Sequence, residues 1–338
     1  MVYNSYEYLS EFILYYSNLA DHIFLIDHKS KKDLREISLP NVSVIRSNHL
    51  AQFQSECTNK IIEDFDIPNQ FDWLFILDID EFLPFTKRDE IEEFLDRNSR
   101  NDVLHFYWRN GTPFHKDTEK PESLIDCNDI RFFKRDNINT IACVNLTRTG
   151  DNFLVPTGAH QIRYKNVPWY FRIPKLSARS VVQSCPAGVP LYHIVAFDKD
   201  QFIRKIKNYV NQMEYRSHVK GQCGWVVRDY PSDLDNDQWL WYLVNFRVTD
   251  SSKHCPVNLT DFERVSIFAA IDREQCLQLR AEIKKLPATE IPIQSQEEKA
   301  YLSFKSDDKA IVENVKWFHI DDNNEILCVD PKLKQIKY

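Results

Sequence analysis

The chain has 338 residues, and its 43 Lys and Arg against 50 Asp and Glu leave a formal net charge of −7. This mildly acidic balance argues against nucleic acid as the main partner, because phosphate backbones are bound by basic surfaces. Aromatic residues are frequent and glycines few, with 22 Phe, 15 Tyr and 6 Gly. That composition predicts a well-packed globular protein and argues against a disordered or repetitive chain.

Nothing in the sequence requires secretion or membrane insertion. The eight cysteines are scattered, without a CxxC pair or a Cys/His cluster at zinc spacing, which is typical of free thiols in a reducing compartment. No signal peptide opens the chain, and no apolar run approaches the roughly 20 residues that cross a bilayer. We therefore expect a cytoplasmic protein without a transmembrane segment, and leave peripheral contact with a membrane open.

The first part of the chain alternates helices with short apolar strands. The expected elements, in order, are a helix at 5–19, a strand at 22–27, a helix at about 31–37, a strand at 42–46, a helix at about 49–65 and a strand at 73–78. This alternation predicts an α/β fold with a Rossmann-like, mostly parallel sheet covered by helices on both faces. Val2 and Tyr3 would close a first strand that is unusually short.

Later elements are less regular. After a helix near 87–96 and a strand at 103–108, residues 115–190 indicate short strands and loops, followed by a strand at 190–195 and a helix at about 198–216. Helices are expected to dominate from 233 to 285. The final forty or so residues could form a hairpin, from 315–320 and 326–329, packed on the body of the protein.

The most informative stretch is 72–83, an apolar run that ends in three carboxylates. On a continuing strand, Asp78 and Asp80 would project to the same side while Ile79 turns to the core. Mg²⁺ or Mn²⁺ held by one or two carboxylates takes its other ligands from substrate phosphates and water, which indicates a phosphate-bearing substrate such as a nucleotide sugar. The plain alternative is a strand that ends in an acidic turn.

Several local patterns together resemble the GT-A glycosyltransferases, specifically their family 2-like and family 92-like branch. The segments that carry the resemblance are 2–12, 21–30, Gln54 with Asn59, 73–82, 108–111, and Leu191-Tyr192-His193 followed by Phe202 and Lys205. Together they cover about residues 1–210, and 73–82, with its Asp-Ile-Asp-Glu-Phe motif, is the most specific. Ser5 departs from the family pattern, which has an Asn-Glu pair at this point.

The resemblance implies a GT-A domain at 1–230, with a nucleotide-binding part at 1–110 and an acceptor-side part at 111–230. Residues 231–338 would then form a mainly helical C-terminal extension and tail. The implied activity is a metal-dependent transfer of a hexose from a nucleotide-diphosphate sugar to a glycan, lipid-linked or protein acceptor. The resembling families lead us to expect inversion at the sugar.

The resemblance also implies roles for individual residues. Donor contacts would come from Tyr3, Asn4, Asp27, Gln54, Asn59, Asp78 and Ile79, and Mn²⁺ or Mg²⁺ would be held by Asp78, Asp80 and His193. Asp198 and Asp151 are candidates for the catalytic base, with Glu81 also conceivable. Four of these residues have a plainer interpretation: Asp27 would only end a strand, His193 would be a satisfied core histidine, and Gln54 and Asn59 would face solvent.

Two other functions remain open. A nucleotidyltransferase also places paired aspartates beside a nucleotide, but no Gly-rich, basic phosphate loop follows the first strand. A non-catalytic nucleotide-sugar-binding protein could keep the fold without turnover, and Ser5 together with the short first strand keeps that alternative in view.

Overall fold

The computed structural model describes most of the first 165 residues and parts of the remainder. The described residues are 2, 4–48, 54–113, 124–127, 129–134, 140–156, 162–165, 184–198, 200–202, 204–205, 262–289 and 318–328. Tyr3 lies outside this set, as do the predicted helix beyond residue 205 and the helices predicted between 233 and 261.

A small sheet forms around two parallel strands, β1 (Ile23–His28) and β2 (Val42–Ser47), with Ile23 opposite Val42. All of β1 except Phe24 is buried, as expected for a strand covered on both faces. The predicted C-terminal hairpin is confirmed: β13 (Phe318–Ile320) pairs antiparallel with β14 (Glu325–Cys328), and β14 extends the sheet by pairing parallel with β2.

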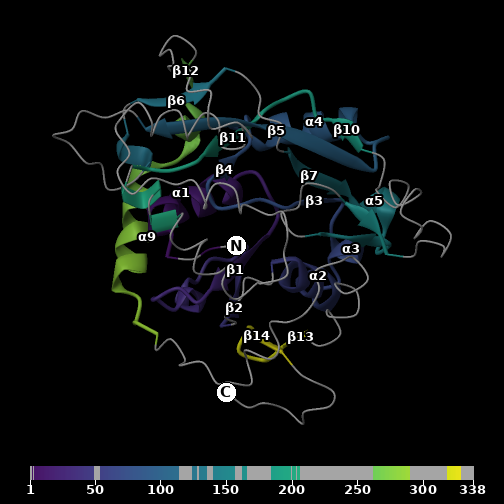
Figure 1. Cartoon of the computed structure of the whole chain (residues 1–338), viewed down its shortest axis with the longest axis horizontal. Helices are drawn as coiled ribbons and strands as arrows, with labels where there is room; N and C mark the ends of the chain where they lie inside the picture. The colour runs from purple at the N-terminus through teal and green to yellow at the C-terminus, as the bar shows by residue number, and fades with distance from the viewer. Residues whose placement is uncertain are drawn as a thin grey trace, which may run out of the picture.

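A larger sheet crosses the top of the molecule in Figure 1, with β1 and β2 beneath it. Its strands are β3 (Trp73–Phe75), β4 (Glu81–Phe82), β5 (Val103–Pro113), β6 (Ile130–Phe133), β7 (Thr140–Asn145), β10 (Ser184–Pro186), β11 (Leu191–Ile194) and β12 (Phe262–Arg264). The long strand β5 organises the sheet, since β10 and β11 pair with it in parallel and β6 and β7 antiparallel.

The α/β class is confirmed, but the prediction of a mostly parallel, Rossmann-like sheet is wrong for this larger sheet, which is mixed and curled. β6 and β7 both pair antiparallel with β5, β6 with its C-terminal part and β7 with its N-terminal part, whereas a mostly parallel sheet would need a crossover between neighbouring strands. A separate pair, β8 (Phe153–Leu154) with β9 (Arg163–Tyr164), is also antiparallel.

The described α-helices surround these sheets. They are α1 (Tyr6–Ser17), α2 (Gln54–Asp64), α3 (Ile67–Gln70), α4 (Arg88–Arg97), α5 (Leu146–Thr149) and α9 (Arg273–Lys285). The helix expected at 31–37 is only a short 3₁₀ turn, η1 (Leu34–Glu36). Two other 3₁₀ turns are η2 (Leu124–Asp126) and η6 (Ile267–Ala270). None of the described helices combines the length and apolar character needed to cross a bilayer.

Helix α1 holds the segment that follows the acidic motif. The Tyr15 hydroxyl donates to the carbonyls of Leu83 and Phe85, and the Tyr16 hydroxyl donates to the Glu81 carbonyl at 3.0 Å. The Tyr15 and Tyr16 rings also pack against Phe82. The apolar face predicted for residues 5–19 therefore lies against β4, which positions the chain just after the carboxylates.

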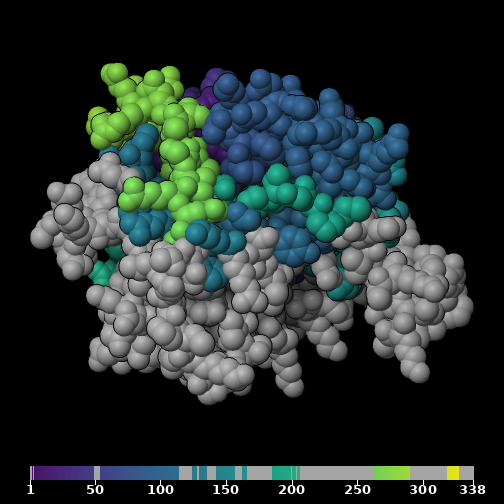
Figure 2. Space-filling view, turned by 90° about the horizontal axis from the view of Figure 1, so that it is seen from above, coloured from purple at the N-terminus to yellow at the C-terminus, as the bar shows by residue number. Residues whose placement is uncertain are grey.

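The described part of 231–338 contains strands as well as helices. β12 joins the larger sheet through β6, and α9 packs on α1 at one side of the molecule (Figure 1). Figure 2 shows segment 262–289, in green, on the surface beside the blue segments that include α4 and β5. Five described cysteines, Cys57, Cys127, Cys143, Cys185 and Cys276, are present as thiols and not as disulfides.

Replacing Gly111 with alanine should destabilise the protein by about 1.5 kcal/mol, because overpacking a buried site forces neighbours apart. A Cβ at this position on β5 would lie 2.3 Å from the Phe132 ring and 2.8 Å from the Arg131 carbonyl. Urea unfolding measures the change. In a Phe132→Leu background the same substitution should cost less, since the ring atoms that collide are gone; equal costs in both backgrounds would contradict the clash.

Candidate functional site

The acidic motif forms a tight turn, so the predicted continuation of the strand to Asp78 is wrong. β3 ends at Phe75, which lies opposite Cys143 of β7. The Glu81 N–H donates to the Asp78 carbonyl at 3.1 Å, and the Glu81 carboxylate accepts from the Asp78 N–H at 2.7 Å. This turn, and not the pleat of a strand, places Glu81 within reach of the charges of both Asp78 and Asp80.

Asp80 lies in a buried charged cluster. Its carboxylate is 2.5 Å from the Lys205 ammonium and 3.7 Å from His193 Nε2, and the residue is only 6% exposed. Burial by itself raises the pKa of Asp80, but the charges of Lys205 and His193 outweigh it and hold that pKa well below its ordinary value. Asp80 is therefore an ionised carboxylate held in one orientation.

His193 is placed by the pairing of β11 with β4, where it lies opposite Glu81. Its Nδ1 lies 3.0 Å from the Asn110 side-chain oxygen, and its ring lies 4.2 Å from the Trp108 ring, centroid to centroid. The alternative of a satisfied, buried histidine thus fits the contacts, yet the same ring directs Nε2 at Asp80. The sequence analysis names Lys205 only within the resemblance, and no local pattern in the sequence predicts its contact with Asp80.

Asp27 lies at the end of β1 and is fully buried. One of its oxygens accepts from the Ser30 N–H at 3.1 Å, and the other lies 2.8 Å from Arg46 Nη1. Burial raises the pKa of Asp27, and the hydrogen bonds from Ser30 and the charge of Arg46 offset this only in part. Arg46 also donates to the Ser30 carbonyl and to Thr289, so the ion pair shapes the loop after β1.

Asn4 clamps the same loop from the other side. Its side-chain oxygen accepts from the Lys31 N–H at 2.8 Å and from the Tyr6 hydroxyl at 3.0 Å, and its own N–H donates to Ser30. Its φ of 51° is left-handed, a conformation that Asn tolerates better than most residues. Asn4 and Asp27 therefore both hold the loop after β1 in its conformation.

The start of α1 connects this loop to the acidic turn. The Tyr8 hydroxyl donates to Gln201 at 2.7 Å, and burial raises the pKa of Tyr8 with the charge of Asp80 as the next cause. Tyr6, two residues earlier, donates to Asn4 in the loop contact. The loop after β1 thus contacts Tyr6 through the Lys32 N–H, and the charge of Asp80 acts on Tyr8, two residues later in α1.

The other predicted site residues are less open to a ligand. Gln54 Nε2 lies 3.4 Å from Asp78, whereas the Asn59 amide is buried and bonds the Val155 backbone in both directions. Ile79 is buried. Asp198 accepts from the Gln201 N–H at 2.6 Å, near Tyr8, and the exposed Asp151 lies in the turn before β8.

The described residues contain no group of three His, Cys, Asp or Glu side chains arranged to hold a metal ion. The donor chemistry nevertheless fits Mg²⁺ or Mn²⁺, which one or two carboxylates hold when phosphate and water complete the shell. Glu81 Oε1 is buried without a hydrogen-bond partner, and the charges of Asp78 and Asp80 add to the burial that raises the pKa of Glu81. The Lys205 ammonium already occupies a cation position beside Asp80.

No protein-family model matches this chain, and no curated protein matches it in sequence.

Proposed function

We propose that the chain is a metal-dependent glycosyltransferase of the GT-A type, which moves a hexose from a nucleotide-diphosphate sugar to a glycan, lipid-linked or protein acceptor. The observation that carries the proposal is the buried carboxylate of Asp80 in the acidic turn, held by Lys205 and His193, together with the Asp27 loop that contacts Tyr6 on the neighbouring helix α1. The division at residues 110 and 230, inversion at the sugar and a cytoplasmic location belong to the same proposal.

In this proposal the nucleoside lies against the loop after β1, which Asn4, Asp27 and Arg46 hold in shape. Asp78 and Asp80 would hold Mg²⁺ or Mn²⁺, with His193 close enough to orient Asp80. When bound, the metal neutralises charge that builds on the leaving diphosphate. Lys205 keeps Asp80 ionised and in place, and adds a positive charge at the same point.

The acceptor hydroxyl needs a base to take its proton as the new bond forms. We propose Asp198 for this role over Asp151, because Asp198 lies near Tyr8 and therefore on the side of Asp80. One oxygen of Asp198 accepts from the Gln201 N–H, which fixes the direction of the other. Glu81 is unsuited, because burial and the neighbouring carboxylates raise its pKa and favour its neutral form.

The Asp78→Asn/Asp80→Asn double variant should bind nucleoside diphosphate in the presence of Mn²⁺ at least about tenfold more weakly than the wild type, since the amides cannot replace anionic ligands. Calorimetric titration with uridine and guanosine diphosphates measures this. Asp72→Asn, an exposed carboxylate at the other end of the same segment, is the matched control and should bind normally. Unchanged affinity in the double variant would remove the acidic turn from the proposal.

A non-catalytic nucleotide-sugar-binding protein is the second candidate, and the Asp80–Lys205 ion pair favours it, because a carboxylate already neutralised by an ammonium has less to offer a metal. Release of nucleoside diphosphate from a panel of sugar donors with Mn²⁺ separates the two. A transferase releases it, slowly to water and faster with acceptor, whereas a pure binder retains the donor intact.

A further inference from the structure

Helix α9 joins the C-terminal part of the chain to helix α1. Its Arg280 is only 7% exposed, and the guanidinium lies 3.0 Å from an Asp126 oxygen and 3.7 Å from the buried carboxylate of Glu11 on α1. Other buried side chains of the same helix are Cys276, Leu279 and Ile283. Figure 1 shows α9, in green, descending along one side of the molecule to the level of β1 and β2. Buried contacts therefore fix the place where the chain leaves this helix.

After α9 the chain crosses the loop that follows β1. Residues 286–289 form this crossing, which we call the strap. The Asp33 N–H of the loop donates to the Pro287 carbonyl at 3.1 Å, and the Thr289 N–H donates back to the Lys31 carbonyl at 2.9 Å. Hydrogen bonds exchanged in both directions are typical of an antiparallel strand pair. These bonds join backbone groups alone, so a change of side chain in the strap leaves their donors and acceptors in place.

Lys32 lies at the centre of this pairing. It forms an antiparallel bridge with Ala288, and its ammonium donates to the carbonyls of Lys284 and Leu286 at 2.7 and 3.0 Å. Carbonyls at the end of a helix lack partners within the helix, and a lysine ammonium is a suitable donor for them. Lys32 thus fastens the loop to the end of α9 as well as to the strap.

Thr289 connects the strap to the ion pair between Asp27 and Arg46. Its hydroxyl donates to the Ser30 carbonyl at 2.8 Å and accepts from Arg46 Nη2 at 2.9 Å. The same guanidinium nitrogen also donates to the Ser30 carbonyl, at 3.1 Å. One hydroxyl therefore bonds both the loop and the guanidinium that shapes the loop, through one donated and one accepted hydrogen bond.

The backbone of the loop requires such support. Lys29 has a φ of 52°, in the left-handed region that residues with a side chain seldom adopt. A conformation of this kind persists only where surrounding contacts fix it. Ser30, the next residue, is held at both ends: its N–H donates to Asp27, and its carbonyl accepts from Thr289. Thr289 therefore helps to hold the loop in a conformation that is unfavourable by itself.

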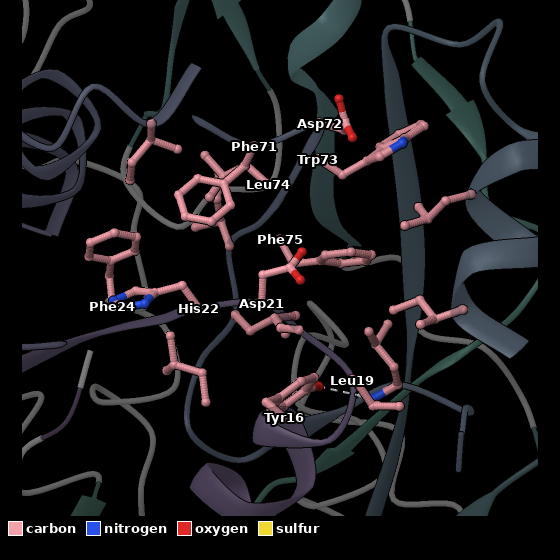
Figure 3. Close-up of a pocket in the computed structure, with 18 of the residues that line it drawn as sticks. Tyr16, Leu19, Asp21, His22, Phe24, Phe71, Asp72, Trp73, Leu74 and Phe75 are labelled. Carbon is pink, nitrogen blue, oxygen red and sulfur yellow. Dashed lines mark hydrogen bonds between the residues drawn. The ribbon is translucent and has the colours of Figure 1, made fainter. Parts of the chain in front are cut away.

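A cavity of about 540 Å³ also borders β1, but the strap does not contribute to it. The cavity lies between β1 and segment 72–77, and Figure 3 shows Phe24 of β1 on one side and Leu74 on the other. Within the described part of the chain, its lining includes no residue of the strap and none of the loop after β1. A substitution at Thr289 therefore leaves the lining of this cavity unchanged.

We propose that Thr289 is a positioning residue for the nucleotide donor, because the strap holds the loop after β1 in the shape that the nucleoside meets. This inference rests on the proposed function, which places the nucleoside against that loop. It also extends the donor site beyond the predicted domain at 1–230, since the strap belongs to the C-terminal segment. Thr289 acts through Ser30 and Arg46, without touching the reacting atoms.

The test compares two substitutions of Thr289 in the full chain. Thr289→Val keeps the shape of the side chain but removes the hydroxyl, whereas Thr289→Ser keeps the hydroxyl and loses a methyl group. Thr147→Val is the matched control, because the Thr147 hydroxyl bonds the exposed Asp72, away from the loop and the strap. Two quantities are measured: hydrogen exchange of the Asp33 amide, which donates to the strap, and calorimetric affinity for uridine and guanosine diphosphates with Mn²⁺.

We expect Thr289→Val to speed exchange of the Asp33 amide at least about fivefold and to weaken diphosphate binding about fivefold or more, because a loosened loop must be ordered on binding. Thr289→Ser and Thr147→Val should stay within about twofold of the wild type in both measurements. Equal losses in Thr289→Val and Thr289→Ser would overturn the proposal, since the hydroxyl would not be the cause.

The two measurements separate this proposal from the proposed function. If the wild type and Thr289→Val bind a diphosphate equally well, the positioning role is overturned and the transferase proposal stands. If the wild type binds neither diphosphate, the transferase proposal is overturned, and the donor role of Thr289 with it. Faster exchange of the Asp33 amide in Thr289→Val would in that case still show that the strap holds the loop.

Discussion

Replacing Arg46 with methionine should lower the free energy of unfolding by about 3–5 kcal/mol, because it leaves the Asp27 carboxylate buried without its charge partner. Both side chains are almost fully buried, at 2% and 0% exposure, and their atoms are 2.8 Å apart. The substitution also removes the hydrogen bonds that Arg46 donates to Ser30 and Thr289, which hold the loop after β1 in place. Urea unfolding at pH 7 measures the loss.

The pH dependence of the free energy of unfolding tests whether the buried charge of Asp27 causes this loss. The pKa of Asp27 is already raised in the folded protein, and removing Arg46 raises it further. A folded-state pKa above the unfolded value means that the folded protein binds the proton more tightly, so stability falls as pH rises through that window. The deficit of Arg46→Met should therefore shrink from pH 7 to pH 5.

Two variants serve as controls for Arg46. Asp27→Asn/Arg46→Met removes both charges and should be more stable than Arg46→Met alone. Arg35→Met breaks a half-exposed ion pair with Asp33 on the same loop and should cost less than about 1 kcal/mol. If Arg35→Met and Arg46→Met cost the same, burial of the charge is not the reason.

Replacing Lys205 with methionine should lower the free energy of unfolding by about 2 kcal/mol at pH 7, since the charged hydrogen bond to Asp80 is lost while that carboxylate stays buried. Lys205 is 25% exposed, which keeps this cost below that of Arg46. In the wild type the depressed pKa of Asp80 contributes stability above the ordinary carboxyl pKa of about 3.9, and this is lost as pH falls through the folded-state pKa. The difference in the free energy of unfolding between wild type and variant should therefore be largest near neutral pH and should disappear below about pH 4.

Arg204→Met is the matched control for Lys205. Arg204 is adjacent in the chain, 58% exposed, and forms its ion pair with Glu7 at 3.3 Å. Its loss should change stability by less than about 1 kcal/mol at any pH, because exposed pairs contribute little. A gap between wild type and Lys205→Met that does not vary with pH would show that Asp80 titrates normally and that the ion pair has no role in its charge.

Local patterns predicted several elements well. Apolar spacing placed α1 within the expected 5–19, and short buried strands were found at β1 and β2. The C-terminal hairpin was also predicted from two apolar runs around polar turn residues, and the structure pairs it as expected. These elements depend on side-chain periodicity and turn chemistry, which neighbouring residues already contain.

The candidate site was predicted less completely. The motif at Asp78 and Asp80 is visible in the chain, but its geometry is not: β7 pairs with β3 only as far as Phe75, and the next residues turn. Asn59 was expected to contact the nucleotide-sugar donor. Its side-chain amide instead donates a hydrogen bond to the Val155 carbonyl, almost a hundred residues later in the sequence. Lys205 contacts Asp80 from 125 residues later in the sequence, and no local pattern encodes this contact.

By itself, the sequence determined the α/β class and the early helices and strands, and it predicted the acidic motif as the candidate site. Only the tertiary structure decided that the larger sheet is mixed and curled, that Asp27 is paired with Arg46, and that a cavity lies between β1 and segment 72–77. The physical reason is that periodicity is a property of neighbouring residues, whereas strand pairing and charge compensation join residues far apart in the chain.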